Sequence, residues 1–134
     1  MESRRVRPAV IAFAGGLDAA LLLLFVLIGR TSHGESLLGV LTTWWPFLAG
    51  LSAGWLVTRA WRDPLGIRWT GLGIVAVTVL VGLLLRVASG QGVQLSFVIV
   101  TIAVIALFLL GWRAIGVLVR RLRRRGEATL ERAR

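Results

Sequence analysis

The sequence contains no cysteine, no tyrosine and no lysine, and its only histidine is His33. Without cysteine the chain has no disulfide, no thiolate metal ligand and no cysteine nucleophile. Without lysine it cannot form a Schiff base with an aldehyde cofactor. A single histidine cannot supply both axial ligands of a haem within one chain. These absences exclude several classes of enzyme and cofactor protein, and no cofactor is expected.

Charge is also scarce over most of the chain. Charged residues make up 16% of the 134 residues, apolar residues make up 57%, and the mean hydropathy is +0.83. The mainly apolar stretches form four segments, at about 9–29, 38–61, 70–87 and 95–112. A helix of about 20 apolar residues crosses the hydrocarbon of a bilayer. The sequence therefore predicts an all-α fold, an integral membrane bundle of four transmembrane helices that forms a single domain (1–134) with a basic tail at 113–134.

The arginines predict the orientation of this bundle. If the N-terminus is cytoplasmic, all arginines except Arg30 and Arg86 fall on the cytoplasmic side. Positive residues in short loops stay in the cytoplasm, so both termini are expected there, in a multi-pass protein of the plasma membrane. The basic tail is expected to bind anionic lipid headgroups at the cytoplasmic face. Because membrane topology explains the net charge of +10, no nucleic-acid partner is expected.

Asp18 is the one acidic residue inside an apolar segment. A charged carboxylate in mid-bilayer costs about 2.5–3.5 kcal/mol on insertion scales, so Asp18 is expected to face the bundle interior. Candidate partners at similar depth are Ser52, Thr78 and Thr101. Two interpretations remain open: a proton or cation site, or a hydrogen-bonded acid that holds helices together.

Arg30 and Arg86 each close an apolar segment on the outer side, and His33 and Glu35 follow Arg30 closely. The guanidinium fork can hold a carboxylate or a phosphate with two bonds, which predicts an outer vestibule for an anionic group. The alternative is that both side chains extend to the outer headgroups. His33 and Glu35 are two ligands without a third, so no metal site is expected.

The stretch TTWWPFLAGLSAGW (42–55) contains several helix-packing signals. Gly50 and Gly54 form a Gly-x-x-x-Gly pair, which lets another helix approach closely, either within the chain or from a second copy in a homo-oligomer. Pro46 cannot donate a backbone hydrogen bond, so the helix either kinks there or starts there. If it starts there, the hydroxyls of Thr42 and Thr43 are candidate caps.

The six tryptophans divide by predicted depth. Five fall at the predicted membrane boundaries and form an interfacial belt, namely Trp44 and Trp45 outside and Trp61, Trp69 and Trp112 inside. Trp55 lies within the second apolar segment, where its indole N–H needs a hydrogen-bond acceptor such as a carbonyl or a hydroxyl.

Four features together resemble one family: the loop GR-x-S-H-x-E (29–35), Asp18, WWPFLAG-x-x-x-GW (44–55) and LLGWR (109–113). The chain resembles the small prokaryotic membrane proteins grouped as domain of unknown function 3054, from about Asp18 to Arg113. The resemblance implies a membrane protein of four helices, and it implies no activity, cofactor or site residue.

Three classes of function follow from these residues. A non-enzymatic scaffold or accessory protein would act through helix contacts at Gly50 and Gly54. A small oligomeric transporter or channel-like protein would use Asp18 for coupling and Arg30 or Arg86 for substrate. An enzyme is the least favoured class, because no nucleophile, base and metal come together, and no catalytic residue is expected.

Overall fold

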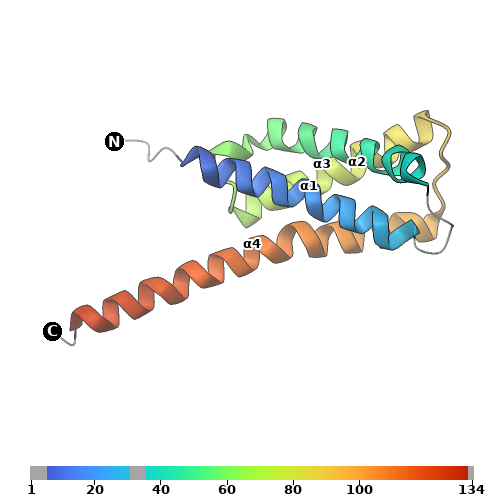
Figure 1. Ribbon diagram of the computed structural model, residues 1–134. Helices are drawn as coiled ribbons and strands as arrows, with labels where there is room; N and C mark the ends of the chain where they lie inside the picture. Colours follow the sequence, from blue (N-terminus) through green and yellow to red (C-terminus); the bar gives the residue numbers. More distant parts are fainter. Residues whose placement is uncertain (1–5, 31–35, 133–134) are drawn as a thin grey trace.

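The computed structural model describes residues 6–30 and 36–132, and within these ranges it contains helices and no strand. Its long helices are α1 (Pro8–Arg30), α2 (Leu37–Thr58), α3 (Leu72–Ala88) and α4 (Leu95–Arg132), with short helices η1 (Ala60–Arg62) and η2 (Ile67–Gly71). They lie side by side as a bundle, and α4 projects beyond it (Figure 1). Four spans, with η2 continuing into α3, are long and apolar enough to cross a membrane. The all-α prediction is confirmed.

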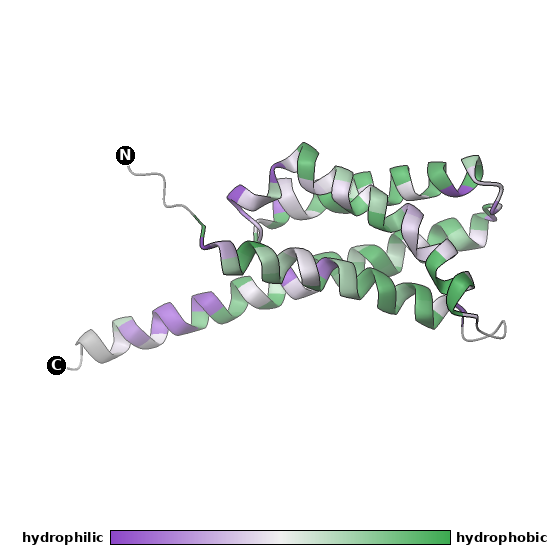
Figure 2. Cartoon of the chain, turned by 45° about the horizontal axis from the view of Figure 1, so that its top comes forward, coloured by the Kyte–Doolittle hydropathy of each residue, from purple (hydrophilic) through white to green (hydrophobic). Residues whose placement is uncertain are grey.

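The outer surface of the bundle is apolar. Large side chains on all four helices are exposed, including Phe13 at 66%, Leu56 at 67%, Leu80 at 62% and Leu107 at 67%. Figure 2 shows the same pattern, with hydrophobic residues along every helix and hydrophilic ones along the projecting part of α4. So large an apolar surface would be costly in water, and it is the surface expected of helices surrounded by lipid.

The start of α2 differs from one of the sequence alternatives. The helix begins at Leu37, where the Ser36 hydroxyl accepts a hydrogen bond from the Gly39 amide at 3.1 Å. Pro46 lies inside the helix, and the first turns of α2 run in a different direction from the rest (Figure 1). The alternative of a helix start at Pro46 is therefore wrong, and the kink is correct. The Thr42 and Thr43 hydroxyls are not caps, because each donates to the carbonyl four residues earlier.

Gly50 and Gly54 bring α2 and α3 into backbone contact. A Cβ atom at Gly50 would lie 2.7 Å from the carbonyl oxygen of Thr78, and one at Gly54 would lie 3.1 Å from Cα of Ile74. Both glycines are buried. The predicted close-packing face thus exists, and of the two partners left open by the sequence, α3 of the same chain occupies it.

The core-facing positions recur every four residues and are polar at the ends of the bundle. On α1 they include Asp18, Leu22, Val26 and Arg30; on α4 they include Thr101, Ile105, Leu109 and Arg113. Buried apolar side chains, among them Leu22, Phe47, Ile74 and Ile105, fill the bundle between them. The apolar layer separates two polar clusters, one at each end.

Candidate functional site

The first polar cluster is built on an ion pair between Asp18 of α1 and Arg113 of α4. Arg113 Nη1 lies 2.8 Å from Asp18 Oδ1, and Arg113 Nη2 lies 2.7 Å from Oδ2. Both side chains are 0% exposed. Two indoles complete the site: Trp55 Nε1 donates to Oδ2 at 2.9 Å, and Trp112 Nε1 donates to Oδ1 at 2.8 Å. A carboxylate has about four acceptor sites, so these four donors occupy them all.

Arg113 also holds the connection between α2 and α3. Its Nε donates to the carbonyl of Pro64 at 3.1 Å, and its Nη1 donates to the carbonyl of Leu109 at 2.8 Å. The guanidinium therefore joins α1, α4 and the connection that contains Pro64. Arg113 and Asp18 together take part in six hydrogen bonds, which is why both charges can be buried.

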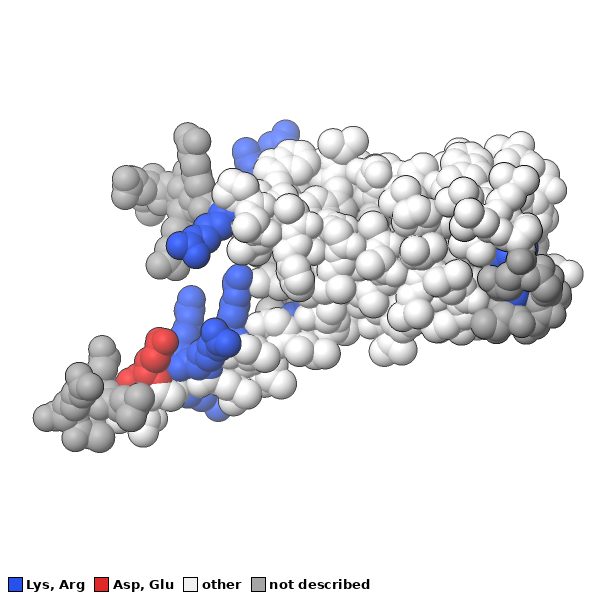
Figure 3. All heavy atoms as spheres, viewed as in Figure 1, with Lys and Arg blue, Asp and Glu red and all other residues white. Residues whose placement is uncertain are grey.

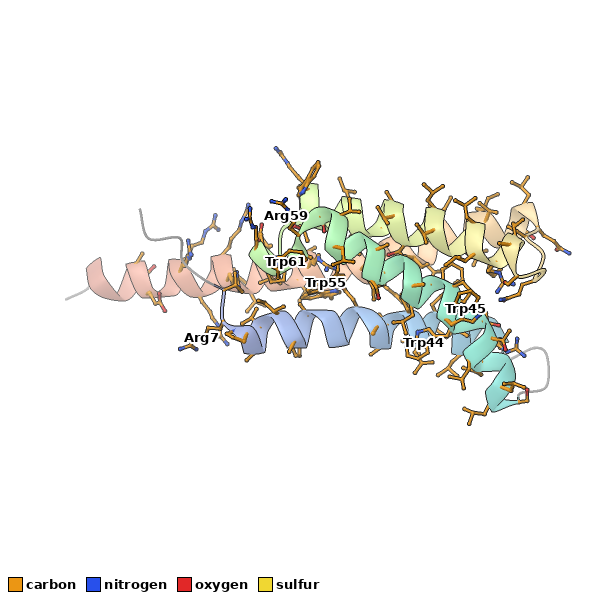
Figure 4. The ribbon with its side chains drawn as sticks, turned by 90° about the horizontal axis from the view of Figure 1, so that it is seen from above. Arg7, Trp44, Trp45, Trp55, Arg59 and Trp61 are labelled. Carbon is orange, nitrogen blue, oxygen red and sulfur yellow. The ribbon has the colours of Figure 1, made fainter. Side chains whose placement is uncertain are left out.

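Trp55 completes the contact between α1 and α2. A Cβ atom at Gly15 would lie 3.6 Å from its ring, so the indole packs on the groove that this glycine leaves in α1. Figure 4 shows Trp55 on the side of α2 that faces α1. The sequence predicts a carbonyl or a hydroxyl as the acceptor for the indole N–H of Trp55. In the structure the acceptor is the carboxylate of Asp18.

The hydroxyl partners expected for Asp18 are not its partners. The Ser52 side chain is exposed and donates to the carbonyl of Leu48. Thr78 and Thr101 are fully buried, but within the described residues their hydroxyls have no hydrogen-bond partner. All three hydroxyls are correctly placed on spans, and the hydrogen bonds found for Asp18 come from indoles and a guanidinium instead.

Two residues of this cluster had been assigned elsewhere. The sequence predicts Trp112 in the interfacial belt and Arg113 in the basic tail; the structure shows that both contact Asp18. One signal in the sequence points to Arg113. It continues the four-residue spacing of Thr101, Ile105 and Leu109, so it extends the buried face of α4 toward the acid that needs a cation.

The second polar cluster lies at the other end of the bundle, around Arg30 and Arg86. Both arginines line one cavity of ≈ 430 Å³, together with Thr43 and Ser96. Arg30 Nη1 donates to Thr43 Oγ1 at 3.1 Å. Arg86 Nη1 donates to Gln91 Oε1 at 2.9 Å, and the Arg86 guanidinium lies 4.6 Å from the centre of the Phe97 ring. We call this cavity the Arg30–Arg86 pocket.

The described residues leave the two positive charges of this pocket without an acidic partner. The Nε atoms of Arg30 and Arg86 are buried and have no hydrogen-bond partner among the described residues. Within residues 6–30 and 36–132 the one salt bridge is that of Asp18 and Arg113, so no described carboxylate neutralises either arginine. The two like charges repel each other. His33 and Glu35, the other members of the predicted vestibule, lie outside the described residues.

A family model described as protein of unknown function (DUF3054) matches residues 16–116. The chain belongs to the DUF3054 family. The match begins just before Asp18 and ends just after Arg113, so both polar clusters lie within the part of the chain that DUF3054 covers. The resemblance drawn from the sequence is thereby confirmed. Neither the curated proteins nor the solved structures gave a match to this DUF3054 chain.

In the part of this DUF3054 protein that the structure describes, no three histidine, aspartate or glutamate side chains are grouped to hold a metal ion. The apolar lining that Phe25, Val26, Phe97 and Val100 give the Arg30–Arg86 pocket offers no metal ligand either. The two clusters differ in chemistry. One is an ion pair whose carboxylate has all its acceptor sites occupied, and the other holds two arginines with no carboxylate partner among the described residues.

The indole bonds to Asp18 give a first testable prediction. Replacing Trp55 by Phe is expected to lower the free energy of unfolding by about 1.5–3 kcal/mol, because a buried carboxylate loses one charged hydrogen bond. The measurement is unfolding by dodecyl sulfate titration in mixed micelles. Trp61, which is 40% exposed, supplies the control replacement Trp61→Phe. Equal unfolding midpoints for the two variants would show that the Trp55 bond contributes nothing.

Proposed function

We propose that this DUF3054 protein is a non-enzymatic, multi-pass protein of the plasma membrane that binds an anion in the Arg30–Arg86 pocket. The observation that carries the proposal is the pairing of two guanidinium groups on one cavity with no described acid between them. Cations in a low-dielectric wall attract an anion more strongly than cations in water do. Guanidinium forks suit a carboxylate or a phosphate, and the Thr43 and Ser96 hydroxyls add neutral donors.

The charge distribution supports an outward-facing pocket. Exposed arginines gather at the end of the bundle opposite to it, and Figure 3 shows them as a group at the end where both termini lie. They are Arg7, Arg59, Arg62, Arg68, Arg120, Arg121, Arg123, Arg124 and Arg125. We call this the arginine-rich end. Because positive residues stay in the cytoplasm, both termini are assigned there, and the Arg30–Arg86 pocket faces outward.

A transporter that couples to ions through Asp18 has less support. A proton or cation site needs a free acceptor and a route to water, whereas Asp18 is fully buried and its two oxygens already accept four hydrogen bonds. The apolar layer of Leu22, Phe47, Ile74 and Ile105 also separates it from the pocket. We therefore assign the Asp18–Arg113 pair to holding the helices together.

A scaffold that acts through Gly50 and Gly54 also has less support. Both glycines are in backbone contact with α3, so their face has no room for a partner protein or a second copy. An accessory role would have to use another surface. Anion binding is the function that uses two arginines for which the described residues supply no carboxylate partner.

The anion proposal predicts stabilisation by inorganic phosphate or sulfate. The full chain in neutral detergent is expected to gain about 1.4 kcal/mol of stability at ten times the dissociation constant, read as a rise in melting temperature. Arg30→Gln and Arg86→Gln should each remove this gain, because each leaves only half of the charged site.

Arg68→Gln is the matched control, since Arg68 is exposed and lies at the arginine-rich end. It should keep the stabilisation of the parent. The proposal fails if phosphate, sulfate and acetate all leave the parent unchanged, or if Arg68→Gln loses the response as completely as Arg86→Gln does.

A further inference from the structure

A second cavity lies between α1 and α4 at the arginine-rich end. The two helices diverge there, and α4 continues past the start of α1 (Figure 1). The space between them has a volume of ≈ 500 Å³. Its walls are apolar side chains and its rim is basic: Phe13, Leu17, Ile115 and Val119 form the walls, and Arg120 and Arg123 lie on the rim. We call it the α1–α4 groove.

The projecting part of α4 has separate apolar and basic faces. Ile115, Leu118, Val119 and Leu122 recur at the spacing of one helix face and are 64%, 55%, 43% and 56% exposed. The intervening positions of the same turns carry the exposed arginines at 120, 121, 123, 124 and 125. An apolar face beside a basic face is the pattern of a helix lying at the boundary between acyl chains and headgroups.

The charged side chains that line the described part of the groove are arginines. Figure 3 shows arginine side chains on both sides of the space between the two helices. On the α1 side the structure describes Arg7, which Figure 4 places at the beginning of α1. Among the described residues that line the groove, none is acidic. A ligand that fits must therefore be apolar where it meets Phe13 and Ile115 and negative where it meets the rim.

We propose that the α1–α4 groove binds a phospholipid with an anionic headgroup. One acyl chain lies between Phe13 and Leu17 of α1 and Ile115 and Val119 of α4, and the phosphate lies beside Arg120 and Arg123. The apolar walls exclude a small inorganic anion as the natural ligand, and the basic rim discriminates against zwitterionic lipids. The site is independent of the Arg30–Arg86 pocket, which lies at the other end of the bundle.

The test uses the full chain in neutral detergent, mixed with either phosphatidylglycerol or phosphatidylcholine, and native mass spectrometry to count retained lipid. The parent is expected to retain phosphatidylglycerol preferentially. The double variant Arg120→Gln/Arg123→Gln should weaken that retention about 25-fold, since each arginine near a headgroup contributes about fivefold.

Arg121→Gln/Arg124→Gln is the matched control. It removes the same charge from the same two turns, but neither residue lines the groove. Its effect should stay within about threefold, because charges directed into solvent are screened. Equal losses from the two double variants would overturn the proposal in favour of diffuse attraction between the tail and anionic surfaces.

A third variant tests the acyl chain separately from the headgroup. Ile115→Trp adds bulk to the wall of the groove and leaves every arginine in place. Because Ile115 is 64% exposed, the fold tolerates the change, which circular dichroism would verify. Retention of phosphatidylglycerol should fall at least as far as in the rim variant. Unchanged retention would show that no acyl chain occupies the groove, and equal retention of phosphatidylcholine by the parent would contradict the preference for an anionic headgroup.

Discussion

Replacing Arg113 by Gln is expected to lower the free energy of unfolding by about 3–5 kcal/mol, because the change leaves the Asp18 carboxylate buried without its cation. Loss of the side chain also frees the carbonyl of Pro64, which now accepts from Arg113 Nε. Asp18→Asn should also lower the free energy of unfolding, because it leaves the buried guanidinium of Arg113 without an anion. The measurement is again unfolding by dodecyl sulfate titration.

The double variant Asp18→Leu/Arg113→Met completes the thermodynamic cycle. It removes both charges together, so it should cost less than the two single changes added, and a well-packed apolar pair can even match the parent. Arg121→Gln, on the exposed face of α4, is the control for loss of one charge. A parent-like midpoint for Arg113→Gln would contradict the structural role of the pair. Loss of ion flux in Asp18→Asn with unchanged stability would revive the transporter interpretation.

Replacing Gly50 by Ile is the second change with a large expected effect. Even the first added atom would lie 2.7 Å from the carbonyl oxygen of Thr78 and 3.1 Å from the amide nitrogen of Gly82. Both are backbone atoms, so α2 and α3 must separate, and overpacking of this kind costs about 1–3 kcal/mol or more. Gly50→Ala should already be destabilising, and Gly50→Ile should prevent the two helices from packing closely.

Gly16 and Gly111 provide matched controls for this prediction. A Cβ atom at either position would meet no atom within 4 Å. Gly→Ala there should be neutral or should stabilise the helix by up to about 1 kcal/mol. If Gly50→Ala unfolds at the same dodecyl sulfate fraction as Gly16→Ala, the close contact between α2 and α3 is not what makes Gly50 necessary.

The sequence was sufficient for the fold because span length depends only on local composition. Four apolar segments of the right length predicted four helices, and the structure has them. The boundaries were less secure. The second segment was expected to run to 61, but α2 ends at Thr58, where Arg59 adopts a left-handed conformation with φ of 52° and η1 follows. Such a turn depends on how the next helix packs, which hydropathy does not record.

The partner of Asp18 was harder to predict because it depends on relative depth and on helix rotation. Ser52, Thr78 and Thr101 were expected at a depth close to that of Asp18, and Arg113 was placed outside the membrane because the apolar run ends at Trp112. In the structure, Asp18 lies level with the connection that contains Pro64. The helices are offset along their axes, and an offset leaves no mark on the sequence of any single helix.

The spacing of Gly50 and Gly54 predicts a close helix contact but does not identify the partner helix. Gly50 and Gly54 correctly predicted a close helix contact, but the spacing serves a neighbour in the chain and a neighbour from a second copy equally well. Only the packing of α3 against this face decides between them. The Arg30–Arg86 pairing was more readily predicted, because both residues end apolar segments on the same side.

The separation of Asp18 from Arg113 by 95 positions has a consequence for biosynthesis. The ribosome makes α1 first and α4 last, so the acid reaches the membrane long before its cation exists. Until then the carboxylate of Asp18 raises the insertion free energy of α1 by about 2.5–3.5 kcal/mol. The four leucines at 21–24 help to offset this cost, because each favours insertion. The last helix to be made therefore supplies the cation that pairs with Asp18. A nascent chain that ends before Arg113 leaves the buried carboxylate of Asp18 without this partner.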